Sequence, residues 1–323
     1  MIGGRSTARA LAVALVAICA SAAAQDFPVR PVRLVVPVPP GGANDIVARV
    51  VAPKAGEILG QPIVIENKGG AAGTIGSDWV AKSRPDGYTL LMTPVPFVIT
   101  QTLYPKLPYD GQKDFAPIAL LTRAPFLIAA STSLPLRSLA ELVASAKSRP
   151  GAVNFSSAGS GSPAHLAGEL LRKTAGVEMV HVPYKGGGPA VADMVAGHVT
   201  FTLATPAEIL PHVAAGKARA LAVTTLARSA LTPETPTVAE SGYPGFEITV
   251  WYGVAAPAGT PGPVVDRLAA AFSAAVASPD IRERLTGMGM EAAYLGPDAF
   301  GRFLRAEHEK WAQLVRDSGA KPD

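Results

Sequence analysis

The sequence predicts an α/β protein of two lobes, and three observations support this. Short β-branched runs alternate with apolar residues at helical spacing along most of the chain. The alternation starts near Val32 and starts again near Val153, which indicates two parallel sheets built from βαβ units. The chain has 323 residues, a length typical of about two domains.

The N-terminal residues 1–24 have the order of a secretory signal peptide. Arg5 and Arg9 precede an uncharged apolar run over 10–20, and small residues follow before Gln25. The run is shorter than the roughly 20 residues that span a bilayer, so we expect cleavage after position 24 and not a membrane anchor. A lipoprotein would use Cys19, but Ile18 is bulky where a small residue is expected. The mature chain then has no cysteine and depends on no disulfide.

The first round of the pattern predicts strands and helices in turn. The run from Val32 to Pro37 is β-branched and predicts a strand, and two glycines follow it. Apolar residues from Ile46 to Leu59 recur at helical spacing, and Pro53 among them should kink or split that helix. Further strands are expected over 63–66 and 88–93, with a short helix over 73–83 between them.

The alternating pattern of strands and helices starts again at residue 153. We expect strands over 153–157, 179–182, 199–204 and 218–224, with helices over 164–174, 189–196 and 206–215. The C-terminal part should be mostly helical, over 263–277, 279–287 and 297–318. Two apolar segments, 115–131 and 246–257, look like connections between lobes. The first lobe would then comprise 25–122 and 248–323, and the second 123–247.

Composition and motifs argue against several classes of function. The net charge is only +4, aromatic residues are 6%, and no basic run is present, so nucleic acid is not an expected partner. The chain has no phosphate-binding P-loop and no G-x-S-x-G elbow, and its Gly-x-Gly lacks the third glycine of a dinucleotide site. His165 and Glu169 share a helix face, but no second cluster suggests a metal. We expect no catalytic residue, no metal and no cofactor.

Two strand-to-helix junctions are the candidate site. Residues 39–45 and 157–163 are rich in Gly, Pro and Ser, and each lies where a helix N-terminus would favour an anion. Such junctions need Gly and Pro for turn geometry in any case, so the same residues are also explained without a ligand. Thr205 to Glu208 has the pattern of a capping box, which we interpret as a stabilising device.

The motifs along the chain resemble one known family. They are VPVPPGGANDIVAR from Val36, LGQP leading into VIENKGGAAGTIG, SSAGSGS leading into HLAGEL, HVPYKG from His181, and WYG followed by APAGTP. In this order they are similar to the Bug/TctC family, the extracytoplasmic solute receptors of the tripartite tricarboxylate transporter type. The resemblance covers nearly the whole chain after residue 24.

The resemblance implies a fold and a function. The expected fold is the type II periplasmic-binding-protein fold, in which two Rossmann-like α/β lobes are joined by two crossover strands around a ligand cleft. The expected protein is a periplasmic monomer that binds a small carboxylate without catalysis. Its partner would be the membrane permease of a tripartite transporter, or a signalling partner in the alternative of a ligand-sensing receptor. An exported hydrolase is a third alternative, for which Ser162 and His165 on one helix turn offer poor geometry.

The resemblance also implies which residues hold the ligand. Ser162 and the backbone at Gly41 and Gly42 should contact the ligand carboxylate, whereas Tyr184, His165 and Trp251 have packing at the lobe boundary as the alternative. The full set expected to bind the ligand is Val38, Pro39, Gly41, Gly42, Asn44, Asp45, Thr93, Ser157, Ala158, Gly159, Gly161, Ser162, His165, Tyr184, Ala190, Asp193, Ala204, Thr205 and Trp251.

Departures from the family pattern bear on which carboxylate is bound. Val38 stands where family members often carry an aromatic residue, and residues 93–96, Thr-Pro-Val-Pro, replace small polar ones. Ala204 and Thr205 occupy a junction that is often more polar. These changes predict an apolar pocket with few side-chain donors, suited to a carboxylate with an apolar body more than to citrate or an amino acid.

Overall fold

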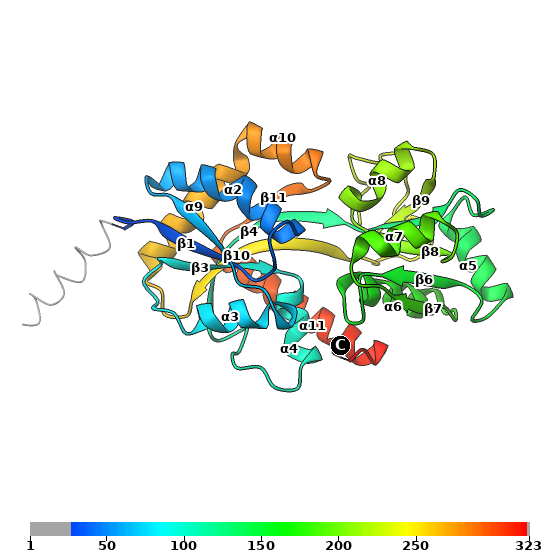
Figure 1. The fold of residues 1–323 in the computed structure, drawn as a ribbon, viewed down its shortest axis with the longest axis horizontal. Helices are drawn as coiled ribbons and strands as arrows, with labels where there is room; N and C mark the ends of the chain where they lie inside the picture. The colour runs from blue at the N-terminus through cyan, green and yellow to red at the C-terminus, as the bar shows by residue number, and fades with distance from the viewer. Residues whose placement is uncertain (1–26, 322–323) are drawn as a thin grey trace, which may run out of the picture.

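The computed structural model describes residues 27–321, and its strands form two separate sheets (Figure 1). The expected signal peptide and Cys19 lie outside the described residues. The first sheet has the order β11-β4-β10-β3-β1-β2 and the second has the order β7-β6-β8-β5-β9. The α/β fold with two lobes that the sequence predicts is therefore confirmed.

The first sheet combines strands from both ends of the chain. Its strands are β1 (Val32–Val36), β2 (Ile63–Asn67), β3 (Thr89–Pro94), β4 (Phe115–Pro125), β10 (Thr249–Pro257) and β11 (Glu291–Leu295). The pairs β1–β2 and β1–β3 are parallel, whereas β10 runs antiparallel to both β3 and β4. Its helices are α2 (Ala43–Leu59), η1 (Ala71–Gly73), α3 (Thr74–Ala81), α4 (Pro96–Leu103), α9 (Gly262–Ala277), α10 (Pro279–Gly287) and α11 (Pro297–Ser318).

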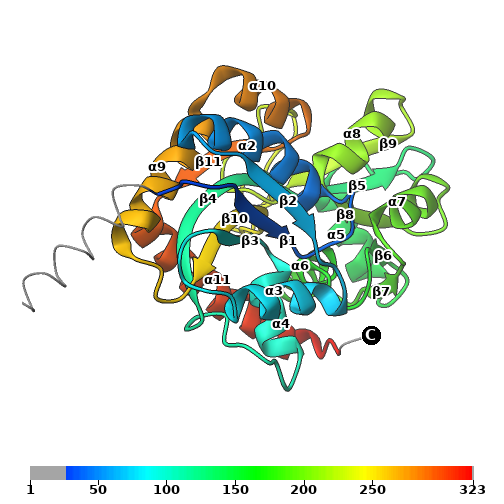
Figure 2. The same cartoon turned by 60° about the vertical axis from the view of Figure 1, so that its left-hand side comes forward.

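Helices cover both faces of the first sheet. Two views show α2, α9 and α10 on one face and α3, α4 and α11 on the other (Figures 1 and 2). The core on the two faces of the sheet is extensive: Leu34, Leu90 and Trp251 are among its fully buried side chains. Helix α11 also packs on a helix of the second lobe, where Lys173 Nζ lies 2.5 Å from Asp317 Oδ2.

The second sheet is built from the middle of the chain. Its strands are β5 (Leu127–Ser131), β6 (Asn154–Ser157), β7 (Val180–Pro183), β8 (Phe201–Ala204) and β9 (Ala218–Val223). The pairs β6–β7 and β6–β8 are parallel, and β5 runs antiparallel to both β8 and β9. Its helices are α5 (Leu139–Ser148), α6 (Pro163–Ala175), α7 (Gly187–Val195) and α8 (Pro206–Ala214).

Two connections join the lobes, and one threonine ties them together. The first passes from β4 through Phe126 into β5, and the second leads from β9 to β10. Thr224, the first residue of the second connection, is fully buried: its hydroxyl accepts from Phe126 N at 2.8 Å and donates to Ile248 O at 2.6 Å. The lobe boundaries expected at 122/123 and 247/248 fall close to this tie and stay a prediction.

The structure corrects the sequence-based expectations in a few places. Helix α2 runs through Pro53 without splitting, because its apolar face packs on α9 and the sheet and holds the backbone helical on both sides of the proline. Helices α4 and α5 were not expected, nor was the edge strand β11, whose short alternating pattern is weak in the sequence. No helix among the described residues is both long and apolar enough to cross a membrane.

Candidate functional site

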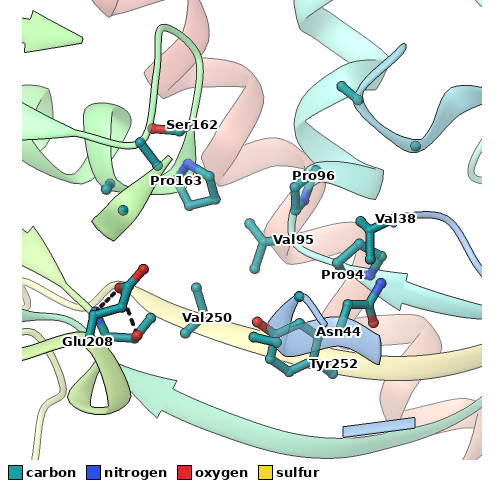
Figure 3. Close-up of a pocket in the computed structure, with 18 of the residues that line it drawn as sticks. Val38, Asn44, Pro94, Val95, Pro96, Ser162, Pro163, Glu208, Val250 and Tyr252 are labelled. Atoms are coloured by element: carbon teal, nitrogen blue, oxygen red, sulfur yellow. Dashed lines mark hydrogen bonds between the residues drawn. The ribbon is translucent and has the colours of Figure 1, made fainter. Parts of the chain in front are cut away.

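A cavity of about 700 Å³ lies between the two lobes. Its walls come from the β1–α2 loop, the β3–α4 junction and β10 in the first lobe, and from the β6–α6 and β8–α8 junctions in the second. Figure 3 shows Val38 and Asn44 on one side, Ser162 and Glu208 on the other, and Val95 and Val250 between them. Both junctions singled out in the sequence therefore reach one cavity.

Most of the residues expected at the site line this cavity. Their contact with a ligand stays a prediction, but their position in the wall is what that prediction requires. They are Val38, Pro39, Gly41, Gly42, Asn44, Ser157, Ala158, Ser162, Ala190, Ala204, Thr205 and Trp251.

Asp45 lies behind the first loop and not in the cavity wall. Its carboxylate is almost fully buried and accepts hydrogen bonds from Gly41 N at 3.0 Å, Arg49 Nε at 2.8 Å and Asn67 Nδ2 at 2.8 Å. The Arg49 bond, helped by the Gly41 and Asn67 bonds and opposed by burial, lowers the pKa of Asp45 to about 2. Asp45 thus fixes the shape of the loop that forms the wall.

Asn44, next to it in the chain, has the opposite character. It is 4% exposed and lines the cavity at the first turn of α2. Neither its side-chain nitrogen nor its side-chain oxygen has a hydrogen-bond partner among residues 27–321. A buried amide left unpaired costs about 1–3 kcal/mol, so this wall is built for a polar group or water that enters the cavity.

The second loop is held from behind by two stacked histidines. The rings of His165 and His181 lie 3.7 Å apart, and Gly161 N donates to His165 Nδ1 at 3.0 Å. Ser162 is the N-cap of α6, and its Oγ accepts a hydrogen bond from His165 N at 3.2 Å. Burial, with a smaller contribution from the neighbouring His165, lowers the pKa of His181 to about 4. His165 therefore supports the loop from outside the cavity lining.

Ser157 and His181 form a contact that the sequence does not reveal. Ser157 Oγ lies 2.6 Å from His181 Nε2, because β6 and β7 pair in a register that places His181 beside Phe155. A serine–histidine pair is the start of a hydrolytic site. Here, however, Ser157 Oγ also bonds to both the N and the O of Gly159, and the low pKa of His181 makes it a weak base at neutral pH. We interpret the pair as part of the loop scaffold.

The other expected residues lie outside the lining or turn away from it. Thr93 is fully buried in β3, and its hydroxyl has no partner in the described part of the chain. Tyr184 donates to Asp193 at 2.6 Å, which ties β7 to α7. Gly159 and Gly161 both have positive φ and shape the loop. Trp251 lines the cavity, but its Nε1 is directed to buried Glu307 at 2.7 Å.

Several lining residues were missed by the sequence reasoning. Val95, Val250 and Tyr252 come from the start of α4 and from β10, whose positions depend on the order of strands in the sheet. Glu208 was assigned only to the capping box, which the structure confirms: Thr205 N and Thr205 Oγ1 each donate to Glu208 Oε2 at 2.8 Å. The same carboxylate also lines the cavity (Figure 3).

No metal-binding group is evident in this region. His165 Nε2 and Glu169 Oε1 lie 3.9 Å apart, as their spacing on one helix predicts. Between residues 27 and 321 there is no group of three or more His, Cys, Asp or Glu that could hold a metal ion.

The fold and the cavity together define a two-lobed binding protein of the type II periplasmic class. The profile of the family described as "Tripartite tricarboxylate transporter family receptor" matches residues 47–320, and the chain belongs to this family. It is 38% identical to protein BugT of Bordetella pertussis, over 96% of this chain and 95% of that protein. The resemblance to Bug/TctC receptors is therefore confirmed.

Two solved structures are similar along almost the whole chain. Rpa4515 of R. palustris with adipate is 36% identical with a TM-score of 0.80, covering 92% of this chain and 100% of that one. MatC of Rhodopseudomonas palustris with bound malate is also 36% identical, with a TM-score of 0.74, covering 90% of this chain and 100% of that one. Both relatives were solved with small dicarboxylates.

Proposed function

We propose that this chain is a periplasmic receptor that captures a small carboxylate between its lobes for uptake by a tripartite tricarboxylate-type transporter. The observation that carries the proposal is the unpartnered amide of Asn44, buried in the cavity wall at the N-terminus of α2. The adipate and malate bound by the two similar structures support the ligand class.

The cavity suits an anion without a basic side chain. The N-termini of α2 and α6 face it from opposite lobes, with Gly42 and Ser162 as their N-caps. Backbone N–H groups at helix N-termini attract anions, and hydroxyls or bridging waters add hydrogen bonds. The remaining wall is largely apolar, with Val38, Val95 and Val250 among it, which favours a carboxylate with an apolar body.

Two helix N-termini and neutral hydrogen-bonding groups in the described wall favour binding, so binding followed by hinge closure is the mechanism we propose. Export by the expected signal peptide would bring the receptor to the periplasm, where a transporter of this type collects its solute. Delivery to a sensor instead of a permease would use the same cavity, and permease genes beside this one would favour transport.

Isothermal titration calorimetry tests the binding site directly. Gly42→Val should abolish or strongly weaken binding of whichever acid binds the wild type, because the side chain enters the cavity wall. The substitution is compatible with the backbone: the φ of Gly42 is −72°, and a Cβ added there would have its nearest atoms 3.7 and 3.8 Å away. Gly262→Val, at the exposed start of α9 with no atom within 4 Å, is the matched control.

Three measurements distinguish the carboxylate receptor from the alternatives. Mass spectrometry of the purified protein should find a co-purified organic acid, and adipate and malate serve as first titrants. Unchanged affinity in Gly42→Val, with a folded protein by circular dichroism, would place the site elsewhere. Turnover of ester or amide substrates that is lost in Ser157→Ala would favour the hydrolase.

A further inference from the structure

Glu208 gives the cavity a charge of the same sign as its proposed ligand. Among the described lining residues, Glu208 is the only one with an acidic or basic side chain. The other polar groups of the wall are neutral: the amide of Asn44 and the hydroxyls of Ser, Thr and Tyr residues. A ligand carboxylate is therefore drawn to one part of the cavity and repelled from another.

The carboxylate of Glu208 is held in place by two helix starts. Oε2 accepts both bonds from Thr205 at the N-terminus of α8. Oε1 lies against the first residue of α7: a Cβ added to Gly187 would be 2.0 Å from it. Glycine at position 187 thus makes room for the Glu208 carboxylate. This carboxylate lies between the N-termini of α7 and α8, at a position where a bound anion would otherwise be favoured.

The free oxygen of Glu208 is available to a ligand. No residue between 27 and 321 donates a hydrogen bond to Oε1, and Figure 3 shows it pointing toward the open cavity. Tyr252 lies between Glu208 and Asn44 in the same view. Burial first, and the charge of Glu208 second, raise the pKa of the Tyr252 hydroxyl.

We propose that Glu208 determines which group the cavity accepts at the end of the ligand far from the bound carboxylate. The cavity then prefers a carboxylate whose far end carries a hydrogen-bond donor, a hydroxyl or an ammonium group, over a dicarboxylate of the same length. This rests on the proposed function. The near carboxylate takes the α2 and α6 side, at Asn44 and Ser162, and the distal donor bonds to Glu208 Oε1. A second carboxylate at that end meets a like charge, and the lining formed by residues 27–321 holds no cation to offset it.

The charge can be removed without removing the cap. Glutamine at the third helical position also serves a capping box, since its side-chain oxygen accepts the same bonds from Thr205. Glu208→Gln therefore isolates the charge. Glu141→Gln is the matched control: Glu141 holds the same position in α5, where it accepts from Arg137 N at 2.6 Å, and it does not line the cavity.

The experiment compares ligands that differ only at one end. Hexanoate, 6-hydroxyhexanoate, 6-aminohexanoate and adipate are titrated by calorimetry into the full mature protein, and the four- and eight-carbon sets are run likewise. Glu208 is solvent-exposed, so solvent weakens its effect, and we expect adipate to bind about tenfold more weakly than the better of the two donors. In Glu208→Gln adipate should gain about that factor, while in Glu141→Gln it should not.

Each result decides one question. Tighter binding of the hydroxy or of the amino acid identifies which donor the site takes, and both support the proposal. Equal affinity for adipate and both donors in the wild type, or no gain for adipate in Glu208→Gln, would overturn it and leave carboxylate capture standing. If no acid of any series binds the wild type, the proposed function fails and this inference fails with it.

Discussion

Replacing Asp45 by asparagine should destabilise the protein by an amount that depends on pH. In the folded chain the pKa of Asp45 falls from 3.8 to about 2, chiefly through the Arg49 hydrogen bond. At about 1.4 kcal/mol for each pKa unit, this difference corresponds to about 2 kcal/mol of stability. The carboxylate is almost fully buried, but Arg49 is 52% exposed, so solvent screens part of that energy and we expect about 1–2 kcal/mol to remain.

The sign of the pH dependence follows from the lowered pKa. The stabilisation is fully present above the unfolded pKa near 3.8 and is lost as the pH falls through the folded pKa of about 2, below which the carboxyl is protonated in both states. Asp45→Asn should therefore lose about 1–2 kcal/mol of unfolding free energy at pH 7 and only about 0.4 kcal/mol, relative to the wild type, at pH 2.

Urea unfolding at pH 7, 5, 3 and 2 measures this difference. Glu57→Gln is the control, because Glu57 is on the same helix and pairs with Lys54 at 3.1 Å but is 71% exposed, so its loss should cost less than about 0.5 kcal/mol. A cost at pH 7 that matches the control, or a cost equal at pH 7 and pH 2, would refute the reasoning. The loop from Gly41 would then not depend on the Asp45 charge.

Two further outcomes follow from the second loop. Ser162→Ala removes the N-cap of α6, so it should lower stability by about 1 kcal/mol in thermal melts and also weaken ligand binding in calorimetry. A loss of stability without a loss of affinity would restrict Ser162 to capping. Since the pKa of His181 is lowered from 6.5 to about 4, the unfolded chain binds the extra proton first, and stability should fall as the pH drops from 6.5 towards 4. His181→Phe keeps the stacked ring and should flatten that part of the profile, whereas an unchanged slope would assign the titration to other groups.

The local parts of the site could be predicted from the sequence. Gly, Pro and Ser at 39–45 and 157–163 have strong turn and capping preferences. Both segments were therefore correctly predicted as strand-to-helix junctions, and most of the site residues named in them line the cavity. The family motifs then placed both junctions at one cleft. Helix boundaries were close, because Pro at the first helical position marks the start of α6, α8 and α10.

What the sequence could not show depends on strand order. The contact of Ser157 with His181 arises from β6–β7 pairing across 24 positions, and Tyr252 reaches the cavity only because β10 lies beside β3. Glu208 has an obvious local role as a cap, which concealed its second position in the wall. Asp45 was expected at the ligand as part of the 39–45 junction, but helical geometry turns its side chain away from that of Asn44.

We expect the hydrogen bonds of Thr224 to influence how quickly a bound solute is released. Because one buried hydroxyl bonds to Phe126 and Ile248, the two connecting segments share a pivot and cannot bend independently. We therefore expect the lobes to rotate about this pivot, and the barrier to opening to depend on its hydrogen bonds as well as on the ligand. Thr224→Val would loosen the pivot without touching the cavity, so it offers a way to change residence time separately from chemical selectivity.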